Sequence, residues 1–137
     1  MILHLAFFIR IGCLLFLYNR VHHLRILRYN VFIMQIITNQ LTLDELKKVA
    51  ANMFGNMVKA VVDVDRELIA LDAELHSDLE ALLLGNGSKQ RNLWGINFYP
   101  EMQGNEFLEF DSMINIRPSQ GNRSRDVNDP ETRKKII

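Results

Sequence analysis

The chain has 137 residues, of which 48% are hydrophobic and 23% are charged, and its 16 basic residues balance 16 acidic ones. This composition is typical of one folded domain with one core, and the zero net charge argues against a globally basic nucleic-acid-binding protein. The single cysteine, Cys13, excludes an intramolecular disulfide framework and a multi-cysteine zinc site. We therefore expect a cytoplasmic protein.

The first 33 residues differ in character from the rest of the chain. Residues 2–18 form an apolar run that contains Arg10, and further arginines follow this run. A central arginine is costly in a transmembrane helix, and a signal peptide carries its positive charge before the apolar run. Translation beginning at Met34 is therefore the preferred interpretation. A membrane-associating segment and a packed helix are the alternatives.

A single α+β domain is expected over residues 34–137, with residues 1–33 as an apolar and basic extension outside the fold. The domain begins with "MQIIT" (34–38), which is a candidate for a short strand. Thr42 and Glu45 then have the spacing of a capping box, in which each side chain satisfies a backbone N–H near the other residue. This pair predicts the start of a helix.

Two apolar, β-rich runs follow, at residues 57–64 and 67–74, and the polar pair between them predicts a hairpin. Ser77 and Glu80 have the spacing of a second capping box. The apolar run behind them ends at Gly85, which is typical of a helix C-terminus. The sequence therefore predicts a second helix after this hairpin.

The last third of the chain predicts a second hairpin and a final helix. Residues 93–99 and 107–117 are the two strand candidates. Asp129 and Pro130 are a typical N-cap and first helical residue. The helix that they begin reaches the last residue of the chain, so it is a candidate for truncation. The predicted order is β-α-β-β-α-β-β-α.

Apolar and polar residues alternate along the predicted strands, so each strand has one apolar and one polar face. The polar positions include Lys59, Asn97 and Glu109, and the apolar positions include Ile69 and Ile96. This pattern predicts a small antiparallel or mixed sheet with its helices on one face and a polar second face. The simplest interpretation of that second face is contact with water.

The segment after the last predicted strand has an unusual density of hydrogen-bond donors. Pro118 ends the strand, and Gly121 permits a positive φ angle. The candidate ligand-binding residues are Arg117, Ser119, Gln120, Asn122, Arg123, Ser124 and Arg125. Guanidinium groups suit phosphate and carboxylate groups, so the segment predicts binding of an anion. In the alternative, the arginines pair with acidic neighbours such as Glu109 and Asp111 and fix the loop.

His76 is the second candidate, with Glu74 beside it as a further catalytic candidate. A histidine next to carboxylates is suited to general acid–base catalysis. The alternative is a structural hydrogen bond. Because His76 is the only histidine after residue 23, a multi-histidine metal site is excluded in the domain, and we expect no metal and no cofactor.

Two long segments, "ELHSDLEALLLGNGSKQRNLWGINFYP" and "FLEFDSMINIRPSQGNRSRDVNDPETRKKI", resemble a family of small prokaryotic proteins described as a domain of unknown function (DUF 5674). The resemblance covers about residues 34–137. It implies membership of this family and no particular reaction.

The sequence favours a domain that binds a small anionic or phosphate-bearing ligand through the loop 117–125. A hydrolase or RNA-directed nuclease that uses His76 as acid and base is the alternative, and a protein-interaction module is a third possibility. A nucleic-acid partner and the oligomeric state stay open, and membrane contact is expected only if residues 1–33 belong to the protein. If strands 67–74 and 93–99 run parallel, His76 and the arginine loop should leave from opposite ends of the sheet.

Overall fold

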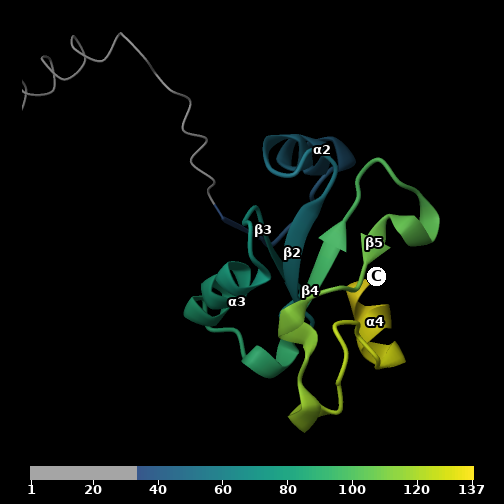
Figure 1. Ribbon diagram of the computed structural model, residues 1–137. Helices are drawn as coiled ribbons and strands as arrows, with labels where there is room; N and C mark the ends of the chain where they lie inside the picture. Colours follow the sequence, from purple (N-terminus) through teal and green to yellow (C-terminus); the bar gives the residue numbers. More distant parts are fainter. Residues whose placement is uncertain (1–33) are drawn as a thin grey trace, which may run out of the picture. The chain divides into compact units, whose positions relative to one another are not determined.

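The computed structural model describes residues 34–137, and the interpretations of residues 1–33 lie outside this described part. Figure 1 shows an α+β domain with the predicted order of elements. Its strands and helices are β1 (Gln35–Ile37), α2 (Leu43–Asn52), β2 (Val58–Asp63), β3 (Leu68–Leu71), α3 (His76–Gly85), β4 (Leu93–Phe98), β5 (Leu108–Glu109) and α4 (Pro130–Ile136). The fold class and the order β-α-β-β-α-β-β-α are therefore confirmed.

The five strands form one antiparallel sheet in the order β1-β3-β2-β4-β5. The central strand β2 pairs with β3 and with β4, and Ala60 lies opposite Leu71 on one side and Ile96 on the other. Because β3 and β4 are both antiparallel to β2, they run parallel to each other. The C-terminal ends of β3 and β4 therefore lie at the same end of the sheet.

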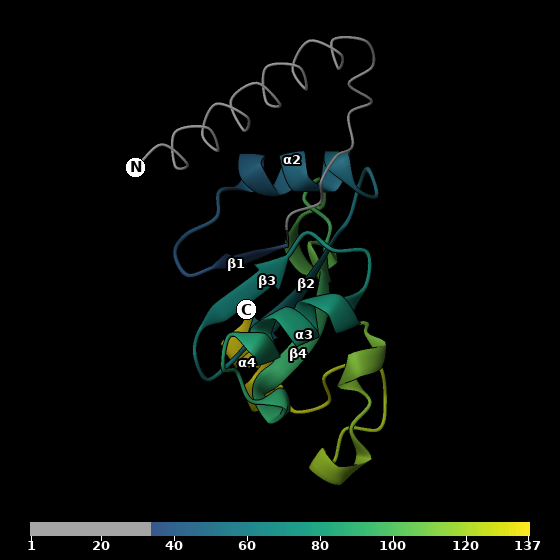
Figure 2. The same cartoon turned by 90° about the vertical axis from the view of Figure 1, so that its left-hand side faces the viewer.

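Helices cover both faces of the sheet, so the prediction that all helices lie on one face was wrong. Leu46 of α2 packs in one apolar cluster with Ala60 and Val62, and Ile136 of α4 lies against the same cluster. On the other face, Leu79 of α3 packs with Val61. Figure 2 shows α3 in front of the sheet and α4 behind it. The physical reason is that β2 is apolar at successive positions, and a strand that is apolar on both sides needs cover on both faces.

Two of the three predicted helix starts are confirmed. Thr42 and Glu45 form the capping box of α2, and the carboxylate of Asp129 accepts a hydrogen bond from the backbone N–H of Thr132 at the start of α4. The start of α3 differs from the prediction, because Ser77 lies inside its first turn. Its N-cap residue is Leu75, which provides no side-chain hydrogen bond. The first turn of α3 therefore lacks a side-chain cap.

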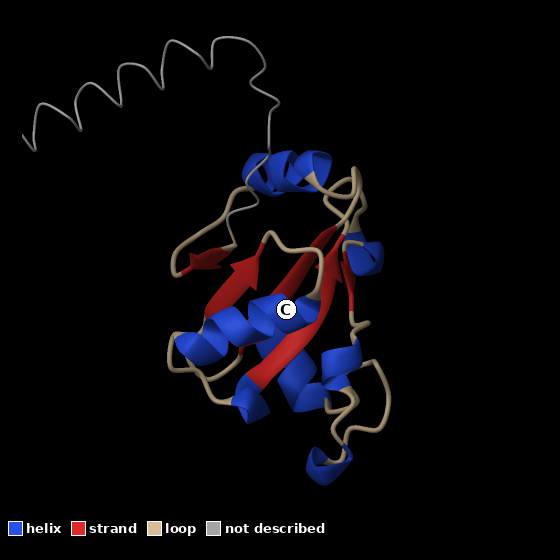
Figure 3. Ribbon diagram, turned by 60° about the vertical axis from the view of Figure 1, so that its left-hand side comes forward, coloured by secondary structure: helices blue, strands red, loops and turns tan. Residues whose placement is uncertain are grey.

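The predicted strand 107–117 is also shorter than expected. Only Leu108 and Glu109 pair with β4, and the chain then continues as loops and short turns, as Figure 3 shows. After β5 it passes very close to Gly95 of β4, where a Cβ atom would lie 2.5 Å from the Cβ atom of Ser112. The absence of a side chain at Gly95 thus allows the loop to cross β4 instead of continuing the ladder.

Candidate functional site

The loop 117–125 is held in a tight reversal by its own backbone. The N–H of Arg117 donates to the carbonyl of Asn122 at 2.7 Å, and the N–H of Asn122 donates back at 3.2 Å. Gly121 occupies the left-handed region with a φ angle of 81°, as the sequence predicted. The chain therefore runs out to this turn and returns, and Arg125 comes to lie beside Ser112. The N–H of Ser112 donates to the carbonyl of Arg125 at 3.0 Å.

Arg117 stabilises the fold rather than presenting its charge to a ligand. Its Nε donates to the carbonyl of Ile114 at 2.9 Å, Nη1 donates to the carbonyl of Gln90, and Nη2 pairs with the carboxylate of Glu80 at 3.1 Å. The guanidinium also lies over the ring of Trp94, at 5.3 Å from its centroid, and the residue is only 9% exposed. Among the acidic neighbours suggested by the sequence, Asp111 pairs with Arg125, whereas Arg117 pairs with neither Glu109 nor Asp111. Its carboxylate partner comes from α3.

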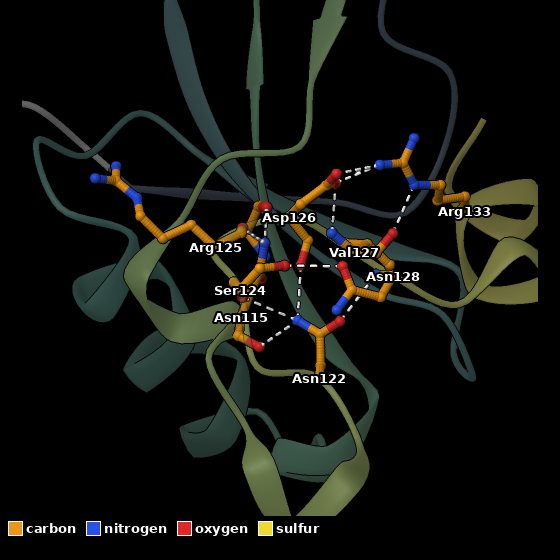
Figure 4. A network of polar contacts seen from close by, with 9 residues as sticks. Asn115, Asn122, Ser124, Arg125, Asp126, Val127, Asn128 and Arg133 are labelled. Atoms are coloured by element: carbon orange, nitrogen blue, oxygen red, sulfur yellow. Dashed lines mark hydrogen bonds and ion pairs between the residues drawn. The ribbon is translucent and has the colours of Figure 1, made fainter.

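Asn122 is a second internal residue of this loop, as Figure 4 shows. Its Nδ2 donates its two hydrogens to the carbonyls of Asn115 and Asp126 at 2.7 Å each, with the carbonyl of Ser124 also within 3.1 Å, and its Oδ1 accepts from the N–H of Asn128 at 2.8 Å. Both polar atoms of the side chain are therefore already used within the protein.

The remaining polar residues of the loop do not converge on one site. Ser119, Gln120 and Arg123 are exposed, and the hydroxyl of Ser124 donates to the side chain of Asn128 at 2.8 Å. Gln120 lines a separate groove beside Asp129. Of the candidates in the loop, only Arg125 reaches the surroundings of His76.

His76 and Arg125 line the same pocket, which we call the His76 pocket. Its volume is about 430 Å³. It lies on the face of the sheet that α3 covers, near the C-terminal ends of β3 and β4. Its polar lining includes Lys59, His76, Asn97, Tyr99, Glu109, Asp111 and Arg125, and its apolar lining includes Met57, Leu75 and Met113. Strands β3 and β4 do run parallel, yet the loop returns along the sheet and brings Arg125 to His76.

Three residues of the pocket form a row across neighbouring strands. Asn97 of β4 lies opposite Lys59 of β2 on one side and opposite Glu109 of β5 on the other. The ammonium group of Lys59 donates to the carbonyl of Glu74 at 2.9 Å and has no carboxylate within ion-pair distance among the described residues. Glu109 likewise has no cationic partner there, and it accepts hydrogen bonds from Asn97 at 2.9 Å and from Tyr99 at 3.1 Å.

Arg125 and Asp111 form an ion pair at the rim of the pocket. Nε of Arg125 lies 2.7 Å from Oδ1 of Asp111, and Nη2 donates to Oδ2 at 2.8 Å. This two-pronged geometry holds both side chains and largely neutralises their charges. The positive charge of Arg125 at the pocket is therefore already paired with the carboxylate of Asp111.

The ring of His76 is held in one tautomer. Its Nε2 lies 2.8 Å from the carbonyl oxygen of Ile96, which can only accept, so Nε2 carries the proton. Burial lowers the pKa of His76, with the carbonyl of Ile96 acting in the opposite direction. The imidazole is therefore neutral at pH 7, and its Nδ1 has a lone pair that can accept a hydrogen bond or a proton.

Glu74, the other catalytic candidate, is exposed and is not part of the pocket lining. Its contribution is the backbone carbonyl that holds Lys59. Among the described residues, no group of three or more histidine, cysteine, aspartate or glutamate side chains could hold a metal ion.

Sequence reasoning placed Lys59, Asn97 and Glu109 on one polar face but assigned that face to water. Their shared face is confirmed by the strand register. This face was expected to contact water because the sequence did not reveal that α3 and the returning loop cover it. Alternation within each strand was the pattern that could have identified the row.

The fold and the pocket define a small α+β protein with a five-stranded antiparallel sheet and a polar pocket beside the start of α3. The chain belongs to the family described as protein of unknown function (DUF5674), whose model matches residues 35–137. This match confirms the resemblance seen in the sequence. Searches of curated proteins and of solved structures found no significant match. In the described part of the chain, no helix is both long enough and apolar enough to cross a membrane.

Proposed function

We propose that the protein binds a small ligand that bears an anionic group, and that the His76 pocket is the binding site. The observation that carries this proposal is the position of Lys59, which lines the pocket and whose ammonium group has no carboxylate partner among the described residues. Leu75, His76 and Ser77, at the start of α3, line the same pocket, and this helix end has no side-chain cap. A helix N-terminus favours negative charge, so both features favour an anionic group.

The arginine loop contributes to this site through Arg125 alone. Arg117 and Asn122 have their side-chain donors engaged within the protein, and they hold the reversal that returns Arg125 to the pocket. Because Asp111 already shares the charge of Arg125, we assign the larger electrostatic contribution to Lys59.

Replacing Lys59 by methionine is expected to weaken binding of the anion at least about tenfold, because one charge-assisted hydrogen bond contributes roughly 1.5–3 kcal/mol. The ammonium group of Lys59 also lies 5.3 Å from the centroid of the Phe54 ring, and methionine removes this charge while it keeps an unbranched apolar side chain beside the ring. Calorimetric titration with small carboxylates, sugar phosphates and nucleotides measures the effect.

Lys89→Met is the matched control, since Lys89 is exposed and lies outside the pocket lining. This variant should bind as the natural protein does. If no anion of the panel binds to the natural protein, or if both variants lose affinity equally, the proposal is wrong.

The second candidate function is acid–base catalysis, and the tautomer of His76 favours it. An imidazole with Nε2 anchored on a carbonyl and Nδ1 unprotonated has the arrangement of a general base. The nearby cations would stabilise negative charge that develops on a substrate. A hydrolase or an RNA-directed nuclease therefore remains the alternative proposal.

For the enzyme hypothesis, His76→Gln should lower the hydrolysis rate of a substrate by at least about 100-fold, the usual effect of losing a general base. The rate of the natural protein should rise with pH through the lowered pKa of His76 and level off near neutrality, because only the neutral imidazole accepts a proton. Suitable assays are release of p-nitrophenol from its acetate and phosphate esters and cleavage of single-stranded RNA. Lys89→Met, at an exposed residue outside the pocket lining, is the control, and equal rates in both variants would exclude His76 as the base.

A further inference from the structure

The row of Lys59, Asn97 and Glu109 on the floor of the His76 pocket indicates the chemical class of the ligand. We propose that the pocket binds a small zwitterion, namely an α-amino acid with an apolar side chain. This inference rests on the proposed function, because it assigns the ligand's carboxylate to the end of the pocket that contains Lys59. It adds a positive group at the opposite end of the row and an apolar group at the rim.

The strand register fixes the distance between the two charged residues. Lys59 and Glu109 lie on β2 and β5, and Asn97 of β4 lies between them in the same row. Neighbouring strands are roughly 4.8 Å apart, so the two outer Cα atoms are about 10 Å apart. The two residues thus carry opposite charges from neighbouring positions of one row, and neither is paired with an oppositely charged side chain of the described protein, which matches a single small molecule that carries both charges.

Asn97 provides an independent indication of a positive group on the ligand. The residue is only 5% exposed, and its Oδ1 has no hydrogen-bond donor among the described residues. Its Nδ2 donates to the carboxylate of Glu109 and to the carbonyl of Asp111, so the reversed amide would place oxygen against two acceptors. A buried acceptor without a donor is costly, and an ammonium group bound by Glu109 would supply that donor once a small shift of the neighbouring side chains exposes Oδ1 to it.

The negative group of the ligand has its counterpart at the other end of the row. The ammonium of Lys59 has one hydrogen bond, to the carbonyl of Glu74, and it can donate up to three. The uncapped first turn of α3 lies in the wall beside it. The two ends of the pocket therefore have opposite electrostatic character.

Part of the rim of the pocket is apolar. Leu75 is 55% exposed and Met113 is 65% exposed, and both line the pocket together with Met57. Small-molecule pockets combine apolar walls with a few polar groups that orient the ligand. An apolar side chain on the amino acid would cover these exposed surfaces, and methionine adapts readily to the shape of such a group.

Calorimetric titration of the full chain with L-leucine and three matched compounds tests this inference. 4-Methylpentanoate lacks the ammonium group, 3-methylbutylamine lacks the carboxylate, and glycine lacks the side chain. We expect L-leucine to bind at least about tenfold more tightly than each of them, because each comparison removes one of the three contacts.

Glu109→Gln should abolish the preference for L-leucine over 4-methylpentanoate and should not weaken the binding of 4-methylpentanoate. Glu106→Gln is the matched control, since Glu106 is exposed and lies outside the pocket lining, and it should preserve the preference. If 4-methylpentanoate binds as tightly as L-leucine and depends on Lys59, the zwitterion inference is overturned while the proposed function stands. If neither carboxylate nor any phosphate binds, both are overturned.

Discussion

Replacing Asn115 by alanine is expected to lower the free energy of unfolding by about 3–4 kcal/mol, because the buried N–H and carbonyl of Gly95 lose their partner and the carbonyl of Arg125 loses one of its two donors. Oδ1 of Asn115 accepts from the N–H of Gly95 at 2.8 Å, and Nδ2 donates to the carbonyls of Gly95 and Arg125 at 2.9 Å each. The side chain is completely buried and acts as a strand partner for β4 at the point where the ladder with β5 has ended. Chemical denaturation measures the loss.

Asn105→Ala is the control for this experiment. Asn105 is exposed in the short turn between β4 and β5, so its replacement should change the free energy of unfolding by less than about 0.5 kcal/mol. A similar small change in both variants would contradict the role that we assign to Asn115.

Replacing Arg117 by alanine is expected to destabilise the fold by about 3 kcal/mol. The substitution removes two hydrogen bonds to carbonyls and leaves the largely buried carboxylate of Glu80 without its cation. Thermal or chemical denaturation should show the loss. In a double-mutant cycle, Glu80→Gln should cost less in the Arg117→Ala background than in the natural protein, because the partner charge is already gone.

Arg123→Ala provides the comparison within the same loop. Arg123 is exposed, so its replacement should cost less than about 1 kcal/mol, as expected for a solvated side chain. Equal and negligible losses for Arg117 and Arg123 would show that the loop is only a solvated turn.

These two stability predictions bear on function because Asn115 and Arg117 fix the path of the chain between β5 and α4. That path carries Asp111 out of the sheet and returns Arg125 to it, where the two residues pair at the rim of the His76 pocket. A variant that loosens the path should therefore disturb the pocket even though neither Asn115 nor Arg117 lines it.

The sequence predicted local features well, because neighbouring residues decide them. The capping box at Thr42 and the N-cap at Asp129 depend on contacts between residues three positions apart. The positive φ angle of Gly121 depends on the absence of a side chain at that residue. The shared face of Lys59 and Asn97 followed from alternation within single strands, because successive side chains of a strand point to opposite faces.

Sequence patterns did not predict the structure correctly where a side chain contacts a residue far away in the sequence. Alternation continued through Asn115, so the segment was predicted to remain a strand, whereas the close approach that Gly95 permits places Asn115 over β4. Ser77 and Glu80 had the spacing of a capping box, but the carboxylate of Glu80 pairs with Arg117 instead. In both cases a residue at least 20 positions away decided the outcome.

The site depended on tertiary structure most of all. By itself, the sequence proposed His76 and the arginine loop as candidate sites and placed Lys59 on a polar strand face. Only the folded chain determined that Arg125 alone among the loop residues reaches His76, and that the pocket between them includes Asn97 and Glu109. The physical reason is that a guanidinium is held by whichever carboxylates and carbonyls the fold brings within about 3 Å of it, and those distances do not exist until the sheet, α3 and the returning loop have packed together.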